Sequence, residues 1–193
     1  MNEAELIKVW EQEQSIAHIH GWDFSHLAGR YTEETDLPWD YQDIILDDLT
    51  PDMKLLDVDT GGGEFLLSLH HPYANTSAAE SYPPNVQLCR ETLLPLGIDF
   101  RAGDGLDALP FADASFDRII NRHGDFNVQD IQRMLKDGGR FITEQVGAEN
   151  DRELVELLLG QTPLPFPEQY LEVARRKFCA AGFTILDAQE CWR

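Results

Sequence analysis

The stretch LLDVDTGGGEF at residues 55–65 decides the fold, because a short apolar run leads into three glycines and then into a helical pattern. Glycines let a ligand approach the backbone closely, so the turn is a candidate binding loop. A dinucleotide-binding loop requires G-x-G-x-x-G, but counting from Gly61 and Gly63 places Leu66 at the third glycine. NAD is therefore disfavoured, and Asp57 at the end of the strand suits a ligand that carries a primary amine.

Strands and helices alternate along the chain after this stretch. Besides the strand at 54–58, strands are expected at 74–80, 98–102, 116–121, 140–146 and 183–190. Helices are expected at 64–69, 83–96, 128–135, 152–159 and 169–181. The alternation indicates βαβ units and hence an α/β fold: a Rossmann-like, doubly wound, mostly parallel sheet with helices on both faces. Ligands of such sheets bind beyond the carboxyl ends of the strands.

The texture of the sequence changes near Thr50-Pro51-Asp52, which divides the chain into two predicted parts. Residues 1–50 combine a helical pattern with glycine, proline and aromatic residues, and we expect them to form an N-terminal helical cap. Residues 51–193 hold the alternating elements and are expected to form the ligand-binding domain. The candidate substrate walls contributed by the cap are Trp22, Phe24, Tyr31 and Trp39.

The charge balance limits the possible partners. The chain has 193 residues, and its 15 Lys and Arg against 35 Asp and Glu give a formal charge of −20. Affinity for nucleic acids comes largely from Lys and Arg contacts to phosphates, so direct nucleic-acid binding is disfavoured, as is an anionic membrane surface. No apolar stretch is long enough to span a membrane, and the acidic start lacks the layout of a signal peptide. A cytoplasmic location is expected.

The histidines and cysteines do not suggest a metal centre. His18, His20, Asp23 and His26 lie close together in sequence, but helix positions i and i+2 do not face each other. The three cysteines are far apart and have no C-x-x-C spacing. We therefore expect no metal.

Two further acids follow predicted strands. Glu80 closes the strand at 74–80, where a carboxylate can accept both hydroxyls of a ribose. Asp104 follows the strand at 98–102 and can accept from an exocyclic amino group such as that of adenine. Together with Asp57, these acids occupy three successive strand ends and indicate a nucleoside ligand.

In combination, these motifs resemble the class I S-adenosylmethionine-dependent methyltransferases over roughly residues 51–190. LDVDTGGG at 56–63 is similar to the family's glycine motif, and AGDG at 102–105 carries the acid for adenine. FADASFD at 111–117 and LKDGGRF at 135–141 resemble the approaches to the family's fourth and fifth strands. The resemblance implies S-adenosylmethionine as the cofactor. The cofactor contacts that it implies come from Asp57, Asp59, Thr60, Gly61, Gly63, Glu80, Ser81, Asp104, Gly105, Asn121 and Arg122.

Two features depart from the family pattern. Asp59 stands where the first glycine of D-x-G-x-G-x-G is usual, and its charge could weaken cofactor binding. Alternatively, Asp57 and Asp59 would favour the cationic cofactor over its less positive product. The family fold also ends in a hairpin of two strands, whereas this chain offers only the strand at 183–190. Either the chain is truncated or the open sheet edge is paired otherwise, for example in a homo-oligomer.

The segment at 121–126 would lie beside the transferable methyl group. It lacks the N-P-P-Y or D-P-P-Y run of the family's amino-methyltransferases, and a Pro-Cys nucleophile is absent, so base methylation is disfavoured. His123 is the candidate catalytic residue, because it could take a proton from an acceptor hydroxyl or amine. Ordering of the loop is its alternative role.

The sequence therefore predicts a methyltransferase that acts on an oxygen, nitrogen or carbon atom of a small molecule. Two alternatives stay open. One is a cofactor-binding or regulatory module without turnover, which Asp59 and the missing strand motivate. The other is an RNA methyltransferase that acts with a basic partner, which the charge of −20 disfavours.

Overall fold

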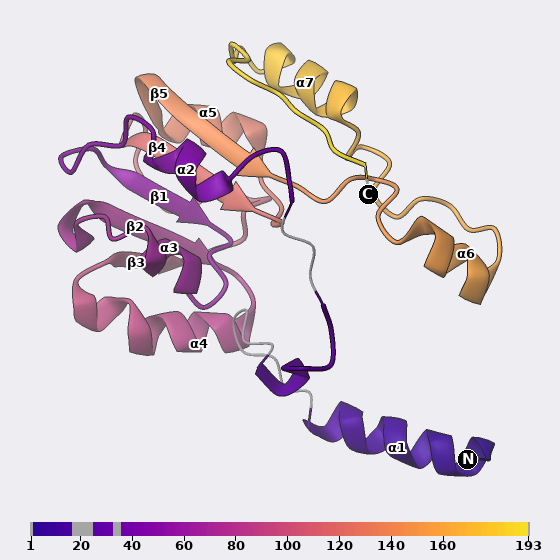
Figure 1. The fold of residues 1–193 in the computed structure, drawn as a ribbon. Coiled ribbons are helices and arrows are strands. Elements are labelled where there is room, and N and C mark those ends of the chain that lie inside the picture. Colours follow the sequence, from indigo (N-terminus) through magenta and orange to yellow (C-terminus); the bar gives the residue numbers. More distant parts are fainter. Residues whose placement is uncertain (1, 17–24, 33–35, 193) are drawn as a thin grey trace.

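The computed structural model describes residues 2–16, 25–32 and 36–192. Its centre is a five-stranded, all-parallel sheet in the order β3-β2-β1-β4-β5, with helices on both faces (Figure 1). The expected doubly wound α/β fold is confirmed. The strands are β1 (Leu55–Val58), β2 (Thr76–Glu80), β3 (Asp99–Ala102), β4 (Phe116–Arg122) and β5 (Leu135–Glu144).

Helices lie between consecutive strands except between β3 and β4, and further helices precede β1 and follow β5 in the chain. In Figure 1, α1 and α6 lie away from the sheet, whereas α2 to α5 lie against it. None of the helices within the described residues is long and apolar enough to cross a membrane. The α-helices are α1 (Glu3–Ile16), α2 (Tyr41–Leu46), α3 (Glu64–Ser68), α4 (Pro83–Thr92), α5 (Val128–Met134), α6 (Arg152–Leu159) and α7 (Leu171–Ala180). Single 3₁₀ turns occur at η1 (Ser25–Leu27), η2 (Tyr73–Asn75) and η3 (Leu94–Leu96).

β1 lies where the strand order reverses. It pairs with β2 on one side and with β4 on the other, and Val58 stands opposite both Ala79 and Asn121. In open parallel sheets, the ligand crevice lies beyond the carboxyl ends of the strands at such a point. The turns that follow the strands therefore meet at one edge, which we call the carboxyl edge.

The core explains why β1 is apolar on both faces. Leu55 packs with Ile120 in a cluster beneath α2, α3 and α4, whereas Leu56 packs with Ile119 in a cluster beneath α5. All four are fully buried, as expected for the central strands of a covered parallel sheet. Tyr41 of α2 belongs to the first cluster, so part of the segment expected as a cap packs into the core of the sheet. The division of the chain at residue 50 stays a prediction.

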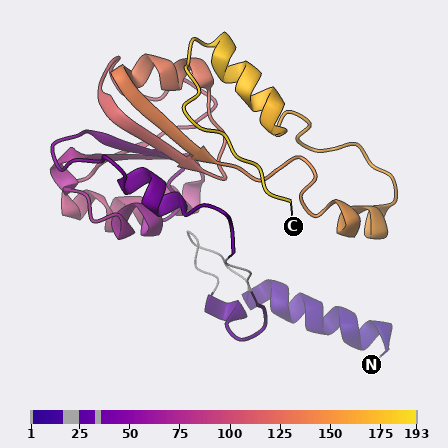
Figure 2. The ribbon, with the colours of Figure 1, turned by 45° about the horizontal axis from the view of Figure 1, so that its top comes forward.

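The strand expected at 183–190 is not formed, and this segment runs past the sheet as an irregular chain (Figure 2). α7 and Phe183, three residues beyond its end, are held near β5 by ring contacts among Phe126, Phe141, Phe178 and Phe183. Within the described residues, β5 pairs with β4 alone. The other edge of β5 is open, and the described residues of 183–190 form no backbone ladder with it. A strand requires such inter-strand hydrogen bonds, so the segment stays irregular.

Candidate functional site

Asp57 closes β1 inside the protein. The residue is 4% exposed, and its carboxylate accepts a hydrogen bond from Thr60 Oγ1 at 2.7 Å. Burial raises the pKa of Asp57 to about 7; the Thr60 bond lowers it, and the charges of Asp59 and Glu80 raise it. Asp57 therefore keeps its proton to a higher pH than an exposed carboxyl does, and a cationic ligand would favour its ionised form.

Asp59 begins the turn after β1 in the left-handed region, at φ 57°, which Asp tolerates better than most side chains do. It lies against Gly124, where a Cβ atom would come within 2.6 Å of Asp59 Oδ2. The carboxylate accepts a hydrogen bond from the Asp125 N–H. Burial, followed by the charges of Glu80 and Asp104, raises the pKa of Asp59 to about 7. Asp59 thus joins the turn after β1 to the turn after β4.

Glu80 closes β2 and is 5% exposed. Its Oε2 accepts the Gly61 N–H at 2.8 Å, and its Oε1 accepts the N–H groups of Ser81 and Tyr82, each at 2.8 Å. The carboxylate therefore fastens the glycine turn to the end of β2. A ribose bound at Glu80 would share the oxygens that accept these amides.

The glycine turn needs glycine for conformation and for space. Gly61 and Gly63 have φ values of 65° and 86°, in the left-handed region. A Cβ atom at Gly63 would also lie 2.7 Å from Leu93 Cδ2. The loop can therefore keep this shape only with the small residues that its motif supplies.

The turn after β3 packs on the turn after β4. Asp104 Oδ1 accepts the Leu106 N–H at 2.9 Å, which orders the first of these turns. The Gly105 carbonyl accepts the Asn127 N–H at 2.7 Å, and a Cβ atom at Gly105 would overlap the Asp125 carbonyl oxygen. The turns after β1, β3 and β4 thus interlock at the carboxyl edge.

Asn121 is fully buried near the end of β4, and its amide joins three segments. Nδ2 donates to the Val58 carbonyl at 2.9 Å, and Oδ1 accepts from Thr143 Oγ1 at 3.2 Å and from Gln145 Nε2 at 2.6 Å. The side chain holds the carboxyl ends of β1, β4 and β5 together. Its contact with the cofactor stays a prediction.

A cluster centred on Glu144 covers the end of β4. Glu144 Oε1 accepts from Arg122 Nε at 2.8 Å and lies 3.6 Å from His123 Nε2. Glu144 Oε2 accepts from Trp39 Nε1 at 2.8 Å. Hydrogen bonds from His123, Trp39 and Arg122 lower the pKa of Glu144 to about 2, although burial opposes them. Glu144 therefore stays ionised beside His123.

The sequence reasoning missed two residues at this edge of the sheet, Glu144 and Tyr41. Glu144 is the last residue of β5 and so lies at the same edge as the acids after the other strands; that position was the signal that could have found it. Tyr41 gave no such signal. Its hydroxyl donates to the Asn121 carbonyl at 2.9 Å, and its ring stacks on Phe65 with a centroid distance of 5.4 Å.

The predicted aromatic walls occupy different positions. Trp39 is partly buried, and its indole N–H is bound to Glu144. Tyr31 is 56% exposed. Trp22 and Phe24 lie outside the described residues. Substrate contact by these four residues stays a prediction.

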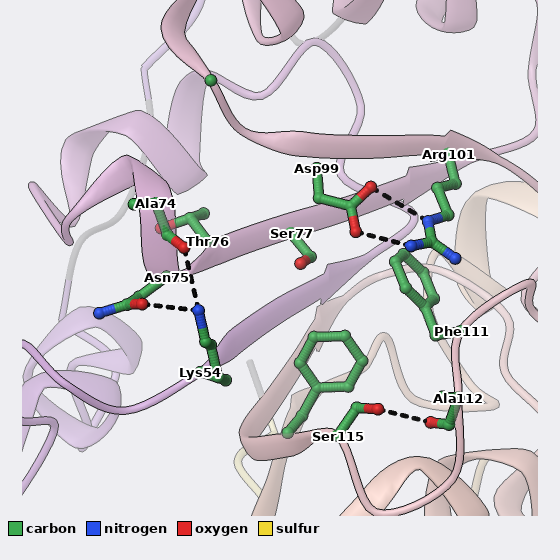
Figure 3. Close-up of a pocket in the computed structure, with 12 residues that line it drawn as sticks. Lys54, Ala74, Asn75, Thr76, Ser77, Asp99, Arg101, Phe111, Ala112 and Ser115 are labelled. Atoms are coloured by element: carbon green, nitrogen blue, oxygen red, sulfur yellow. Dashed lines mark hydrogen bonds and ion pairs between the residues drawn. The ribbon is translucent and has the colours of Figure 1, made fainter.

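A separate cavity of about 320 Å³ lies at the opposite edge, near the amino ends of β1, β2 and β3 (Figure 3). Its charged residues bind one another, the backbone or the side chain of Asn75. Lys54 Nζ donates to the Ala74 carbonyl at 3.0 Å and to Asn75 Oδ1 at 2.7 Å, and Arg101 pairs with Asp99 at 2.8 Å. We therefore place the functional site at the carboxyl edge.

The carboxyl edge fits a ligand with positive charge. Asp57 and Asp59 supply carboxylates, and the charges that raise the pKa of Asp59 are those of other acids. The phosphates of NAD would meet these carboxylates unfavourably. S-adenosylmethionine carries an ammonium and a sulfonium group, so the residues present fit this cofactor.

Comparison with known proteins shows a family match over the central part of the chain. Residues 56–143 match the family model described as a methyltransferase domain. Demethylmenaquinone methyltransferase from Deinococcus radiodurans is 33% identical over an alignment of 100 residues, and the match covers 46% of this chain and 41% of that protein. The chain thus spans less than half the length of this relative.

Solved structures share the fold. The [4+2]-cyclase SpnF is 23% identical, with a TM-score of 0.57, over 76% of this chain and 58% of SpnF. A SAM-dependent methyltransferase from Aquifex aeolicus is 17% identical, with a TM-score of 0.56, over 75% of this chain and 79% of its own. A possible histamine N-methyltransferase from Thermotoga maritima is 20% identical, with a TM-score of 0.52, over 75% of this chain and 70% of its own.

The chain has the α/β fold of these structures, and its segment 56–143 is similar to a methyltransferase domain. The match to the methyltransferase domain model and the similarity to a methyltransferase both point to the class I S-adenosylmethionine-dependent methyltransferases as the family that this part of the chain resembles. S-adenosylmethionine is the cofactor that this family implies.

Proposed function

We propose that this protein transfers the methyl group of S-adenosylmethionine to a small-molecule acceptor. One observation carries the proposal: a single sheet edge joins the acids at the ends of β1, β2 and β3 to the pair of His123 and Glu144 at the ends of β4 and β5. The match to the methyltransferase domain, from 56 to 143, extends from β1 into β5 and so supports both sides of this site.

On the cofactor side, we assign Asp57 and the turn at 61–63 to the methionine part, Glu80 to the ribose, and Asp104 with Gly105 to the adenine. When bound, the cofactor would supply an electrophilic methyl group on a positively charged sulfur. A sulfonium is already a good leaving group, so holding the acceptor in line supplies most of the acceleration. The interlocked turns give the chain the rigid edge that such positioning needs.

On the acceptor side, both the backbone carbonyl and the side-chain carboxylate of Glu144 hold His123 in position. The His123 N–H donates to the Glu144 carbonyl at 2.9 Å, and the imidazole lies beside the ionised Glu144 carboxylate. The imidazole is partly exposed, so it can accept the proton that an acceptor hydroxyl or amine loses. Glu144 would stabilise the resulting imidazolium.

Two observations favour a small molecule over a nucleic acid as the acceptor. The charge of −20 opposes binding of a polyanion. The curated relative is named for demethylmenaquinone, a small organic acceptor.

The test is formation of S-adenosylhomocysteine, measured by mass spectrometry, with quinols, phenols and amines as acceptors and with RNA as a separate acceptor. We expect product with a small molecule and not with RNA. His123→Ala should lower the rate about 10²- to 10⁴-fold and change S-adenosylmethionine affinity less than about twofold. RNA-dependent turnover, or cofactor binding without turnover on any acceptor, would contradict the proposal.

A further inference from the structure

Asp59 is the feature of the carboxyl edge that the proposed function leaves unexplained. A glycine at this position would satisfy the φ of 57° without strain. The chain instead places an aspartate there, and the missing Cβ of Gly124 leaves the space that the Cβ and carboxylate of Asp59 occupy. The Asp125 N–H donates to the same carboxylate. Asp59 is therefore held in one place by two neighbours from the turn after β4.

The charged groups that influence the pKa of Asp59 are all acids. Glu80 faces it from β2, Asp104 from the turn after β3 and Asp125 from the turn after β4, and Asp57 lies two residues before it on β1. Like charges and burial both favour the protonated form of Asp59. A cation that enters this group of acids relieves the repulsion, whereas a neutral ligand does not.

We propose that Asp59 is a specificity-determining residue that makes the site bind the cationic cofactor in preference to its neutral product, and that Gly124 makes room for it. This inference rests on the proposed function. S-adenosylmethionine carries one ammonium, one sulfonium and one carboxylate, so its net charge is +1. After methyl transfer the sulfur is an uncharged thioether and the net charge is zero. A fixed carboxylate therefore interacts favourably with the substrate form and loses that attraction after each turnover.

The expected preference follows from the charge difference. Two unit charges several ångströms apart at a partly buried site interact strongly enough to change an equilibrium constant about tenfold. Binding of the cation should also displace the proton that Asp59 shares with its acidic neighbours at slightly acidic pH. Cofactor binding should therefore release protons, and product binding should release fewer.

Isothermal titration calorimetry with S-adenosylmethionine and with S-adenosylhomocysteine tests the proposal at pH 7.5. Asp59→Asn keeps the shape of the side chain and removes its charge. It should reduce the ratio of the S-adenosylmethionine affinity to the S-adenosylhomocysteine affinity about three- to tenfold, mainly by weakening the binding of S-adenosylmethionine. Asp137→Asn makes the same charge change at an exposed position near the amino end of β5 and should leave the ratio unchanged. Titrations at pH 6.5 in buffers of different ionisation enthalpy should show less proton release for Asp59→Asn than for the wild type.

An equal loss of both affinities, or no change in either, would overturn the proposal while the proposed function stands. Failure of the wild type to bind S-adenosylmethionine would instead overturn the proposed function. A second set of variants tests the fit of Asp59 to Gly124 without any ligand. Gly124→Ala should lower the Tm in the wild type and lower it much less in Asp59→Gly, because the clashing atoms are then gone. An equal fall in both backgrounds would refute the fit.

Discussion

Glu80 Oε2 accepts the Gly61 N–H at 2.8 Å, so a carboxylate at the end of β2 holds the turn that follows β1. The same carboxylate accepts two amides at the start of the β2–α4 connection. One side chain thus shapes the glycine turn and supplies the acid assigned to the ribose. Substitutions at Glu80 should therefore affect folding and cofactor binding together.

Glu80→Ala should lower the free energy of unfolding by about 2–4 kcal/mol, because it leaves three backbone N–H groups without their acceptor. Glu80→Gln keeps one carbonyl oxygen and should lose about half as much. Urea unfolding measures both, with Glu168→Ala as an exposed control. Equal stability of Glu80→Ala and wild type would show that these bonds do not hold the turn.

Gly63 and Gly97 form a matched pair for the packing of the glycine turn. Both lie in the left-handed region, at φ 86° and 88°, but a Cβ atom meets Leu93 at Gly63 and open space at Gly97. Gly97→Ala should cost about 1 kcal/mol for the conformation alone. Gly63→Ala should cost at least about 2 kcal/mol more through the clash, measured by chemical denaturation. Equal losses of stability in the two variants would show that Leu93 does not pack against the glycine turn.

The raised pKa values of Asp57 and Asp59 predict that stability falls as the pH rises. Each carboxyl has a folded pKa of about 7 and an ordinary value of 3.8, so the folded state binds more protons between these values. The free energy of unfolding should therefore decrease from about pH 4 to about pH 7, by at most roughly 4 kcal/mol for each carboxyl. Asp59→Asn should flatten this decrease and Asp137→Asn should not, in urea unfolding at a series of pH values. An unchanged slope in Asp59→Asn would contradict the burial of its charge.

Trp39 and Glu144 should be energetically coupled, because the indole N–H donates to a carboxylate with a strongly lowered pKa. Trp39→Phe removes the donor and keeps a ring, and Glu144→Gln removes the charge. A double-mutant cycle in urea should give a coupling of about 1–2 kcal/mol. Additive effects of the two substitutions would show that Trp39 and Glu144 do not interact, and would contradict the contact between the N-terminal segment and the edge of the sheet.

Most of the fold could be predicted from the sequence, because the hydrophobic pattern of the strands and helices over 51–146 agreed with the glycine and proline residues that separate them. The apolar strands, the glycine turn and the proline start of α4 each indicated the element that formed. The segment at 183–190 has a strand-like composition. A strand also needs a neighbouring segment to pair with, and composition does not identify that partner. Likewise, the acids after the first three strands were visible as a series. Glu144 was not, because β5 was expected to end two residues later.

The contacts of the N-terminal segment could not be predicted for a related reason. Trp39 and Tyr41 looked like parts of a cap, yet each bonds to a residue more than 75 positions away, in β4 or β5. Such long-range hydrogen bonds leave no local pattern in sequence. Asp59 was visible as a departure from the glycine motif, but only the structure shows its partners, Gly124 and Asp125.

Calorimetric titration of the wild-type chain with S-adenosylmethionine and, separately, with NAD tests the central claim most directly. The acidic carboxyl edge predicts binding of S-adenosylmethionine with a micromolar dissociation constant and no measurable heat with NAD. Binding of NAD, or binding of neither compound, would contradict the assignment of this edge to a cationic methyl donor.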